Sequence, residues 1–305
     1  MKVEYVKNAI NYYYNLNPEK IVQKNNEYKF IYDESFYTLI DITDNYKNLN
    51  ELYNISVELN NKGIYTHQFI FNIKNNIETY INDKIYVLLK SYGEMNQLIT
   101  LEDIVKFSNM TNFKYNSKIK KNNWYYLWME KMDYFEYQIS QLSKKFPILT
   151  ESFNYFEGIV ETGISILSLE KNDDSVFSVC HNRICKKNTL FDLYNPLNFI
   201  IDVRVRDVSE FIKETVPINE VNDILETYLN NNALTNLEYK LFFVRFLYPT
   251  FYFDIYEKII NNQIEESEII SCLDNINNYE NLIKLVYEKI NSISILPEIE
   301  WIKKM

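Results

Sequence analysis

Glycine and proline are scarce in this chain of 305 residues, which contains 4 Gly and 6 Pro. No glycine precedes Gly63. A loop that covers nucleotide phosphates needs backbone amides that approach the phosphates closely, and glycine permits this approach. The segment before Gly63 therefore contains no glycine-rich phosphate loop.

Cysteine is also rare, with 3 Cys in the chain. We expect Cys180, Cys185 and Cys272 to be thiols, since their number is odd and cysteines in a reducing compartment rarely form disulfides. Cys180, His181 and Cys185 would supply three zinc ligands, but a closed structural zinc site needs four. No fourth ligand lies nearby in the sequence, so a zinc site is disfavoured.

An excess of positive charge is absent, because the formal net charge is −10 and no long stripe of Lys or Arg occurs. Nucleic-acid backbones are bound by clustered cations, so nucleic acid is excluded as a partner. No run approaches the ~18 apolar residues of a membrane helix, and no signal peptide is recognisable at the N-terminus. We therefore expect a protein without a membrane span that is made and kept in the cytoplasm.

The apolar residues are abundant enough for one large core or two lobes, since 47% of the chain is hydrophobic and 24% is charged. Alternation of apolar and polar residues predicts five strands in the first part of the chain. They are residues 28–32, 36–42, 67–73, 77–81 and 85–89. Helical spacing of apolar residues predicts the following helices: 3–17, 45–61, 101–110, 124–146, 153–169, 221–229, 234–247, 251–260 and 264–293.

This order of elements predicts an α+β fold with two domains. Residues 1–92 form a β-rich N-terminal lobe, and residues 93–305 form a helical C-terminal lobe that begins after a hinge at residues 91–94. An aromatic and apolar stripe in the predicted helix 124–146 indicates core packing rather than a ligand cage. Its members are Trp124, Tyr125, Leu127, Trp128, Met132, Phe135, Ile139 and Leu142.

The candidate functional site lies in residues 179–207. An apolar run enters a polar loop at His181, the loop closes on Asn188, and a second apolar run ends at Asp202. Kinase catalytic centres have this layout, with a catalytic Asp two residues after the His, a metal-binding Asn, and a metal-binding Asp after a hairpin. Arg183 occupies the position of the catalytic Asp. The spacing therefore predicts a phosphoryl-transfer site that has lost its base.

A second group is missing from the strand 36–42, where a kinase carries the lysine that pairs with the nucleotide phosphates. Ile40 or its neighbour Asp41 occupies that position. An apolar or acidic side chain cannot neutralise phosphate, so nucleotide binding should be weakened. Glu51 and Glu58 in the next helix are candidates for the glutamate that pairs with such a lysine, but solvated surface carboxylates are the simpler interpretation.

Three stretches resemble the spore-coat kinase-like proteins of endospore-forming Firmicutes, the CotS and YutH group, which share the fold of aminoglycoside and choline phosphotransferases. The stretches are residues 155–164, 179–213 and 245–254. The resemblance implies a bilobal protein-kinase-like fold, similar to aminoglycoside phosphotransferases, with a five-stranded N-lobe and a mainly helical C-lobe. It also implies that the loop histidine is a packed residue that bonds to the backbone.

The loop of this chain departs from the resembled superfamily at the catalytic position. Active phosphotransferases have His-Gly-Asp where this chain has His181, Asn182 and Arg183. Asn tolerates positive φ, so the backbone turn can survive, but arginine cannot accept a proton. Loss of the base alone costs ~10²–10⁴ in rate. We therefore expect a catalytically inactive kinase-like protein, a pseudokinase, in which Arg183 pairs with Asp202 and fills the metal site.

The resemblance implies a role in the structure or assembly of the spore coat, with other spore coat proteins as partners. The protein would be made in the cytoplasm of the mother cell and deposited on the coat. The alternative is a small-molecule phosphotransferase with an unusual active site, in which Asn188 and Asp202 bind the Mg²⁺ of ATP. Its base would be Glu161 or Asp192, for which a solvated or capping carboxylate is the simpler role. A module that binds ATP without turnover is a third possibility.

Two structural roles are also predicted. Asp207 and Glu210 fit a capping box at the start of a helix, with Asp207 as the cap and Glu210 reaching back. His67 opens a predicted strand, so a structural or surface role is expected rather than a catalytic one.

Overall fold

The computed structural model describes residues 3–45, 48–114, 117, 119–120, 123–170, 176–215 and 217–304. The chain divides into two compact units. Unit 1 comprises Met1–Lys120, His181–Arg183 and Lys187–Ile201, and unit 2 comprises Lys121–Cys180, Ile184–Lys186 and Asp202–Met305. The predicted lobe boundary after residue 92 stays a prediction.

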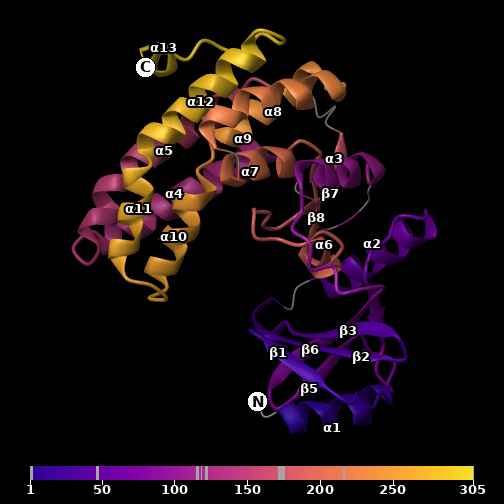
Figure 1. The fold of residues 1–305 in the computed structure, drawn as a ribbon. Helices are drawn as coiled ribbons and strands as arrows, with labels where there is room; N and C mark the ends of the chain where they lie inside the picture. Colours follow the sequence, from indigo (N-terminus) through magenta and orange to yellow (C-terminus); the bar gives the residue numbers. More distant parts are fainter. Residues whose placement is uncertain are drawn as a thin grey trace. The chain divides into compact units, whose positions relative to one another are not determined.

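Unit 1 contains an antiparallel sheet of six strands in the order β1-β2-β3-β6-β4, with β5 also paired to β6 (Figure 1). The strands are β1 Ile21–Lys24, β2 Glu27–Tyr32, β3 Ser35–Asp41, β4 Gln68–Ile70, β5 Glu78–Ile81 and β6 Lys84–Ser91. The prediction of five strands missed β1. Only Ile21 of this short edge strand is buried, so its sequence shows no alternation.

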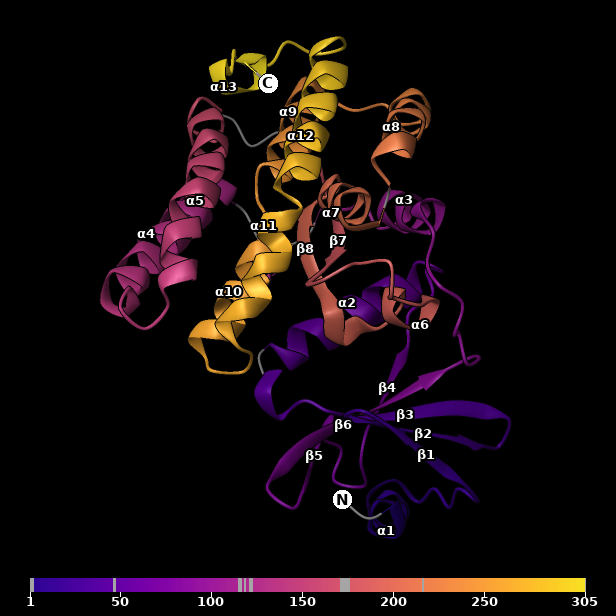
Figure 2. The same cartoon turned by 60° about the vertical axis from the view of Figure 1, so that its left-hand side comes forward.

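One face of this sheet packs on α1 (Val3–Tyr14). Successive residues of a strand point to opposite faces. Tyr28 and Phe30 of β2 therefore share a core with Val6 and Ile10 of the helix, whereas Lys29 lies on the other face. Both views place α1 and α2 (Leu49–Asn61) on opposite sides of the sheet (Figure 1 and Figure 2).

The remaining elements of unit 1 are short. They are η1 (Thr43–Asn45), α3 (Leu101–Met110), α6 (Leu190–Leu193) and η2 (Pro196–Asn198). Thr100 and Asp103 form a capping box that fixes the start of α3. The strands β7 (Phe177–His181) and β8 (Phe199–Val203) pair as a separate two-stranded sheet, as the strand, loop and hairpin pattern of the sequence predicts. Residues 177–180 and 202–203 of these strands belong to unit 2.

Apart from its residues of β7 and β8, unit 2 is helical in its described part. Its elements are α4 Trp124–Leu142, α5 Pro147–Ser168, α7 Arg206–Thr215, α8 Ile218–Asn231, α9 Asn236–Phe246, α10 Thr250–Ile260, η3 Glu266–Ile269, α11 Ile270–Asp274, α12 Ile276–Asn291 and α13 Glu300–Lys304. Helix α5 begins at Pro147, earlier than predicted, because proline is favoured in the first turn of a helix rather than being only a breaker. The predicted helix 264–293 is divided into η3, α11 and α12.

The helices α4 and α5 pack side by side (Figure 2). The predicted core role is confirmed for five of the eight members of the aromatic and apolar stripe of α4, which are buried: Trp124, Trp128, Met132, Phe135 and Ile139. It is wrong for Leu127, which is exposed. The close approach depends on Gly163 of α5, since a Cβ atom added there would lie 3.0 Å from the ring of Trp128. Glycine therefore allows α5 to approach α4 closely at this position.

Candidate functional site

His181 ends β7 and is packed inside unit 1. Its side chain is buried, and Nε2 donates a hydrogen bond to the backbone carbonyl of Leu193 at 2.9 Å. The imidazole ring lies 5.6 Å from the rings of Phe107 and Phe199. These contacts give His181 a structural role in holding the loop that follows β7, as the resemblance implies.

Arg183 and Asn188 lie in the same loop of unit 1. Arg183 is exposed, and its Nη1 donates a hydrogen bond to the backbone carbonyl of Asn182 at 2.9 Å. Asn188 is partly buried, and its backbone carbonyl accepts a hydrogen bond from the N–H of Ile99 at 3.1 Å. The loop therefore presents a guanidinium at the position of the base, and a role of Asn188 as a metal ligand stays a prediction.

Asp192, an alternative candidate for the base, caps α6. Its Oδ2 accepts hydrogen bonds from the backbone N–H of Thr189 at 2.7 Å and from the Thr189 hydroxyl at 3.0 Å. The two residues form a capping box, which satisfies backbone donors at the start of a helix. This carboxylate therefore has the structural role that was the simpler interpretation.

Asp202, the predicted metal ligand, is buried in unit 2. Its Oδ1 accepts hydrogen bonds from the indole Nε1–H of Trp124 at 2.9 Å and from the N–H of Val203 at 2.8 Å. Its Oδ2 lies 3.3 Å from Nε of Arg206, which is buried as well. The cation beside Asp202 in unit 2 is thus Arg206. The expected pairing of Arg183 with Asp202 joins residues of different units and stays a prediction.

The carboxylate of Asp202 is buried and has partners on both oxygens, and its role as a metal ligand stays a prediction. Burial raises the pKa of its carboxyl to about 6, although Arg206 and the hydrogen bonds act in the opposite direction. Hard cations such as Mg²⁺ require carboxylate oxygens that can be directed at the ion, and both oxygens of Asp202 are already bound. Among the described residues, no group of three or more His, Cys, Asp or Glu side chains is arranged to hold a metal.

A buried ion network lies next to Asp202 in unit 2. Glu210 of α7 accepts from Nε of Arg245 at 2.5 Å and from Nζ of Lys213 at 2.9 Å. The Coulomb attraction of Arg245 and Lys213 lowers the pKa of Glu210 to about 2, against the opposing effect of its burial. The network accounts for part of the stretch 245–254, since Thr250 also donates to Glu210 at 3.1 Å.

The prediction of a capping box at Asp207 and Glu210 is wrong. Helix α7 begins at Arg206, so Asp207 lies within its first turn rather than before it. Asp207 accepts from Nη1 of Arg206 at 2.8 Å, and Glu210 is bound by cations of its own and a neighbouring helix. The local sequence matched a cap, but Asp207 pairs with the adjacent Arg206, and Glu210 pairs with Arg245 of another helix.

The face of the large sheet in unit 1 that does not pack on α1, called the free face below, borders a cavity of about 820 Å³. Thr38 and Ile40 point to this face, and the assignment of Ile40 or Asp41 to the position of the missing lysine stays a prediction. The residue opposite Ile40 is Glu27, an acid. Asp41 lies at the strand end and pairs with Lys84 at 2.5 Å. Ile40, Glu27 and Asp41 do not line the cavity, whereas Lys20, Lys24 and Lys29 do, so weakened nucleotide binding stays a prediction.

The two glutamates of α2 that were candidates for a lysine partner have other contacts. Glu51 accepts a hydrogen bond from the hydroxyl of Ser117 at 3.1 Å. Glu58 is exposed and pairs with Lys62 one turn along the same helix at 2.6 Å. Glu58 is therefore a solvated surface carboxylate, which confirms the simpler interpretation for that residue.

His67 has the structural role that was expected of it. It is fully buried, and its Nε2 donates to the backbone carbonyl of Phe191 at 2.9 Å. The pKa of His67 is lowered to about 4, mainly because burial disfavours the charged imidazolium. A neutral imidazole that bonds to a backbone carbonyl fixes the position of Phe191 in unit 1.

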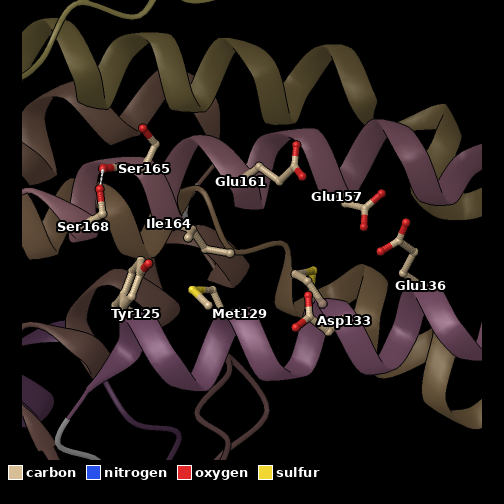
Figure 3. Close-up of a pocket in the computed structure, with 10 residues that line it drawn as sticks. Tyr125, Met129, Asp133, Glu136, Glu157, Glu161, Ile164, Ser165 and Ser168 are labelled. Carbon is tan, nitrogen blue, oxygen red and sulfur yellow. Dashed lines mark hydrogen bonds between the residues drawn. The ribbon is translucent and has the colours of Figure 1, made fainter.

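A second cavity of about 360 Å³ lies between α4 and α5 in unit 2. Figure 3 shows Glu136 and Glu157 directed toward each other, with Asp133 and Glu161 beside them. Burial, Glu136 and Glu161 raise the pKa of Glu157 to about 7. Glu161 was predicted only as a candidate base, and the cluster was not predicted. Spacings of three residues in α4 and four in α5 place each pair on one helix face.

The three cysteines are thiols, as predicted. None of the helices in the described part of the chain is long and apolar enough to span a membrane.

Comparisons with known proteins agree with the architecture of the two units. The structure is similar to spectinomycin phosphotransferase APH(9)-Ia in complex with ADP and spectinomycin, with a TM-score of 0.59, 12% identity, and coverage of 93% of this chain and 97% of that chain. It is also similar to amicoumacin kinase hAmiN, with a TM-score of 0.57, 13% identity, and coverage of 98% and 96%. These likenesses show an aminoglycoside phosphotransferase-like kinase fold, as predicted.

Sequence comparisons identify the family. The Endospore coat-associated protein YutH of Bacillus subtilis (strain 168) is 24% identical over 289 residues, which cover 84% of this chain and 85% of that protein. The family model described as "Spore coat putative kinase YutH" matches residues 7–285. Because this match spans most of the chain, the protein belongs to the spore coat YutH family.

Proposed function

We propose that this protein is a catalytically inactive kinase-like component of the spore coat, which acts in coat structure or assembly. The observation that carries the proposal is the carboxylate of Asp202, whose two oxygens are bound by Trp124, Val203 and Arg206 inside unit 2. A metal ligand of a phosphotransferase must present its oxygens to Mg²⁺. Asp202 serves instead as the anion that compensates a buried guanidinium.

The substitutions in unit 1 support the same conclusion. Arg183 stands at the base position and cannot accept a proton, and Ile40 stands at the position of the phosphate-binding lysine. The loss of base, lysine and accessible metal ligand affects three separate steps of phosphoryl transfer. The coat role follows from the family and from the coat-associated relative in Bacillus subtilis. We further propose synthesis in the mother-cell cytoplasm and other coat proteins as partners.

The first test measures phosphoryl transfer from ATP and Mg²⁺ to small hydroxylated and amino compounds. The wild type should show no transfer above background, and Arg183→Asp should not gain activity, because Asp202 remains bound by Arg206. Transfer by the wild type that Asp202→Asn abolishes would overturn the proposal. Gain of activity in Arg183→Asp would show that the metal ligand is available and that only the base was missing.

The second test separates the coat role from catalysis. Spores from a strain with Asp202→Asn should have a normal coat and normal lysozyme resistance, whereas a strain that lacks the protein should have a coat defect. A coat defect in Asp202→Asn, with the variant protein present at the wild-type level, would contradict a purely structural role.

The alternative function is a small-molecule phosphotransferase with ATP and Mg²⁺. It requires Asn188 and Asp202 as metal ligands and a base from another part of the chain. Of the two candidate bases, Asp192 is bound in a capping box, and Glu161 lines the cavity between α4 and α5. A thermal shift with ATP that depends on Mg²⁺ would favour this alternative, and its absence in the wild type would count against it.

A further inference from the structure

The cavity of unit 1 has the size of a ligand site. Its volume of about 820 Å³ lies within the range of ~300–1,000 Å³ that ligand cavities occupy. The lining combines apolar side chains of the sheet, among them Val22, Ile31 and Phe36, with the aromatic ring of Phe191. Val22 and Ile31 are more than half exposed, so apolar surface faces this space.

Lys29 occupies the free face of the sheet at this cavity. In the strand register it lies opposite Val22 of β1 on one side and opposite Thr38 of β3 on the other. Side chains of directly opposite residues point to the same face. Lys29 therefore projects from between two shorter side chains, and both of these neighbours also line the cavity.

The ammonium of Lys29 already has two partners. Its Nζ lies 3.1 Å from the carboxylate of Glu27 and 4.7 Å from the centre of the Phe191 ring. Phe191 is buried, packs on the ring of His67 at 4.4 Å, and is held by the hydrogen bond from His67 to its carbonyl. The ring is thus fixed, and the ion pair with Glu27 holds the ammonium of Lys29 beside it.

A planar ring cannot stack on Phe191 at this place while Lys29 remains. Insertion between the ring and the ammonium needs about 7 Å, which is two van der Waals contacts of about 3.5 Å each. The observed separation of 4.7 Å is too small. The compensation of Lys29 by Glu27 also makes it a poor replacement for the missing phosphate-binding lysine.

We infer that Lys29 determines which ligands the cavity of unit 1 accepts, because its ammonium covers the ring of Phe191 and excludes a planar purine base. Removal of this side chain opens the ring to stacking and leaves the remaining lining unchanged. The inference concerns unit 1 alone, and it depends neither on Asp202 nor on the absence of catalysis.

The test is titration calorimetry with adenosine and, separately, with ADP. Lys29→Ala should bind adenosine at least about tenfold more tightly than the wild type, since a competing cation–π contact has been removed. Lys29→Arg, which keeps a cation over the ring, should bind as weakly as the wild type. Lys84→Ala is the matched control, because Lys84 pairs with Asp41 on the same sheet and does not line the cavity.

Each outcome decides the inference. Equal adenosine affinity in wild type and Lys29→Ala, tighter binding by the wild type, or no binding by either protein would overturn it. Lys29→Val, which suits a β-strand, provides a second variant should Lys29→Ala unfold. If Lys29→Ala binds ADP and, when given ATP and Mg²⁺, transfers the γ-phosphoryl group to a hydroxylated acceptor, the inference stands and the proposed loss of base and metal ligand fails. If Lys29→Ala and Lys29→Val bind neither adenosine nor ADP, the inference fails and the proposed coat role is unaffected.

Discussion

The carboxylate cluster between α4 and α5 makes the stability of unit 2 depend on pH. The pKa of Glu157 rises from its ordinary 4.5 to about 7, because of partial burial and the nearby Glu136 and Glu161. Replacing Glu157 with Gln keeps the shape of the side chain but removes the charge. We therefore expect Glu157→Gln to be more stable than the wild type at alkaline pH and nearly equal to it at acidic pH.

The sign and size follow from the pKa. The folded state binds a proton at Glu157 more tightly than the unfolded state, so the wild type is relatively most stable below pH 4.5. That stability is lost as the pH rises through 7. Without solvent screening, the rise of this pKa from 4.5 to about 7 would lower the free energy of unfolding at alkaline pH by at most about 3.4 kcal/mol. Because the carboxyl is only partly buried, solvent screening reduces this to about 1 kcal/mol.

Urea unfolding at pH 5 and pH 8 measures the effect. The free energy of unfolding of Glu157→Gln should exceed that of the wild type by about 1 kcal/mol at pH 8 and by a few tenths at pH 5. The matched control is Glu130→Gln, an exposed position on α4 that does not line the cavity. An equal gain at both pH values, or an equal gain in the control, would refute the role assigned to the cluster.

Two further predictions concern packing and charge in unit 2. Gly158→Ala should stabilise α5 by up to about 1 kcal/mol, because the added methyl group meets nothing within 4 Å. Gly163→Ala should be less stable than Gly158→Ala by about 1 kcal/mol or more, because its methyl group lies 3.0 Å from the ring of Trp128. Equal thermal unfolding temperatures for the two variants would contradict this prediction. Arg245→Met should lower the free energy of unfolding in urea by about 3–5 kcal/mol, since it removes a buried partner of Glu210. Lys240→Met, at a partly exposed ion pair, should lower it by no more than about 1 kcal/mol. Similar losses in the two variants would show that the buried network contributes little.

Much of the fold could be predicted from local pattern. Apolar and aromatic runs between polar turns identified β2, β3, β5 and β6. Buried residues alternate with more exposed ones in β2 and β5, whereas β3 and β6 contain consecutive buried residues. The edge strand β1 was missed, since pairing with β2 rather than its own burial pattern makes it a strand. The start of α5 was missed because Pro147 was taken as a break, although proline fits the first turn.

The sequence predicted which residues occupy the candidate site but not which residues they contact. His181 was identified as a packed residue that bonds to the backbone, and the structure confirms this through the carbonyl of Leu193. The partner of Asp202 could not be read from the sequence, where Arg206 is one of several nearby cations. The prediction for Glu210 failed for the same reason, since the partner that decides its position is Arg245 on another helix.

The amino-acid sequence by itself determined which chemical groups are present: no glycine before Gly63, no lysine at Ile40, and a guanidinium at Arg183 where a proton acceptor is needed. These are properties of single positions, and folding cannot change them. Only the tertiary structure decided which groups meet, as when Lys29 of β2 lies over the ring of Phe191 in unit 1. Such contacts join residues far apart in the chain, so they depend on how strands and helices pack rather than on any local pattern.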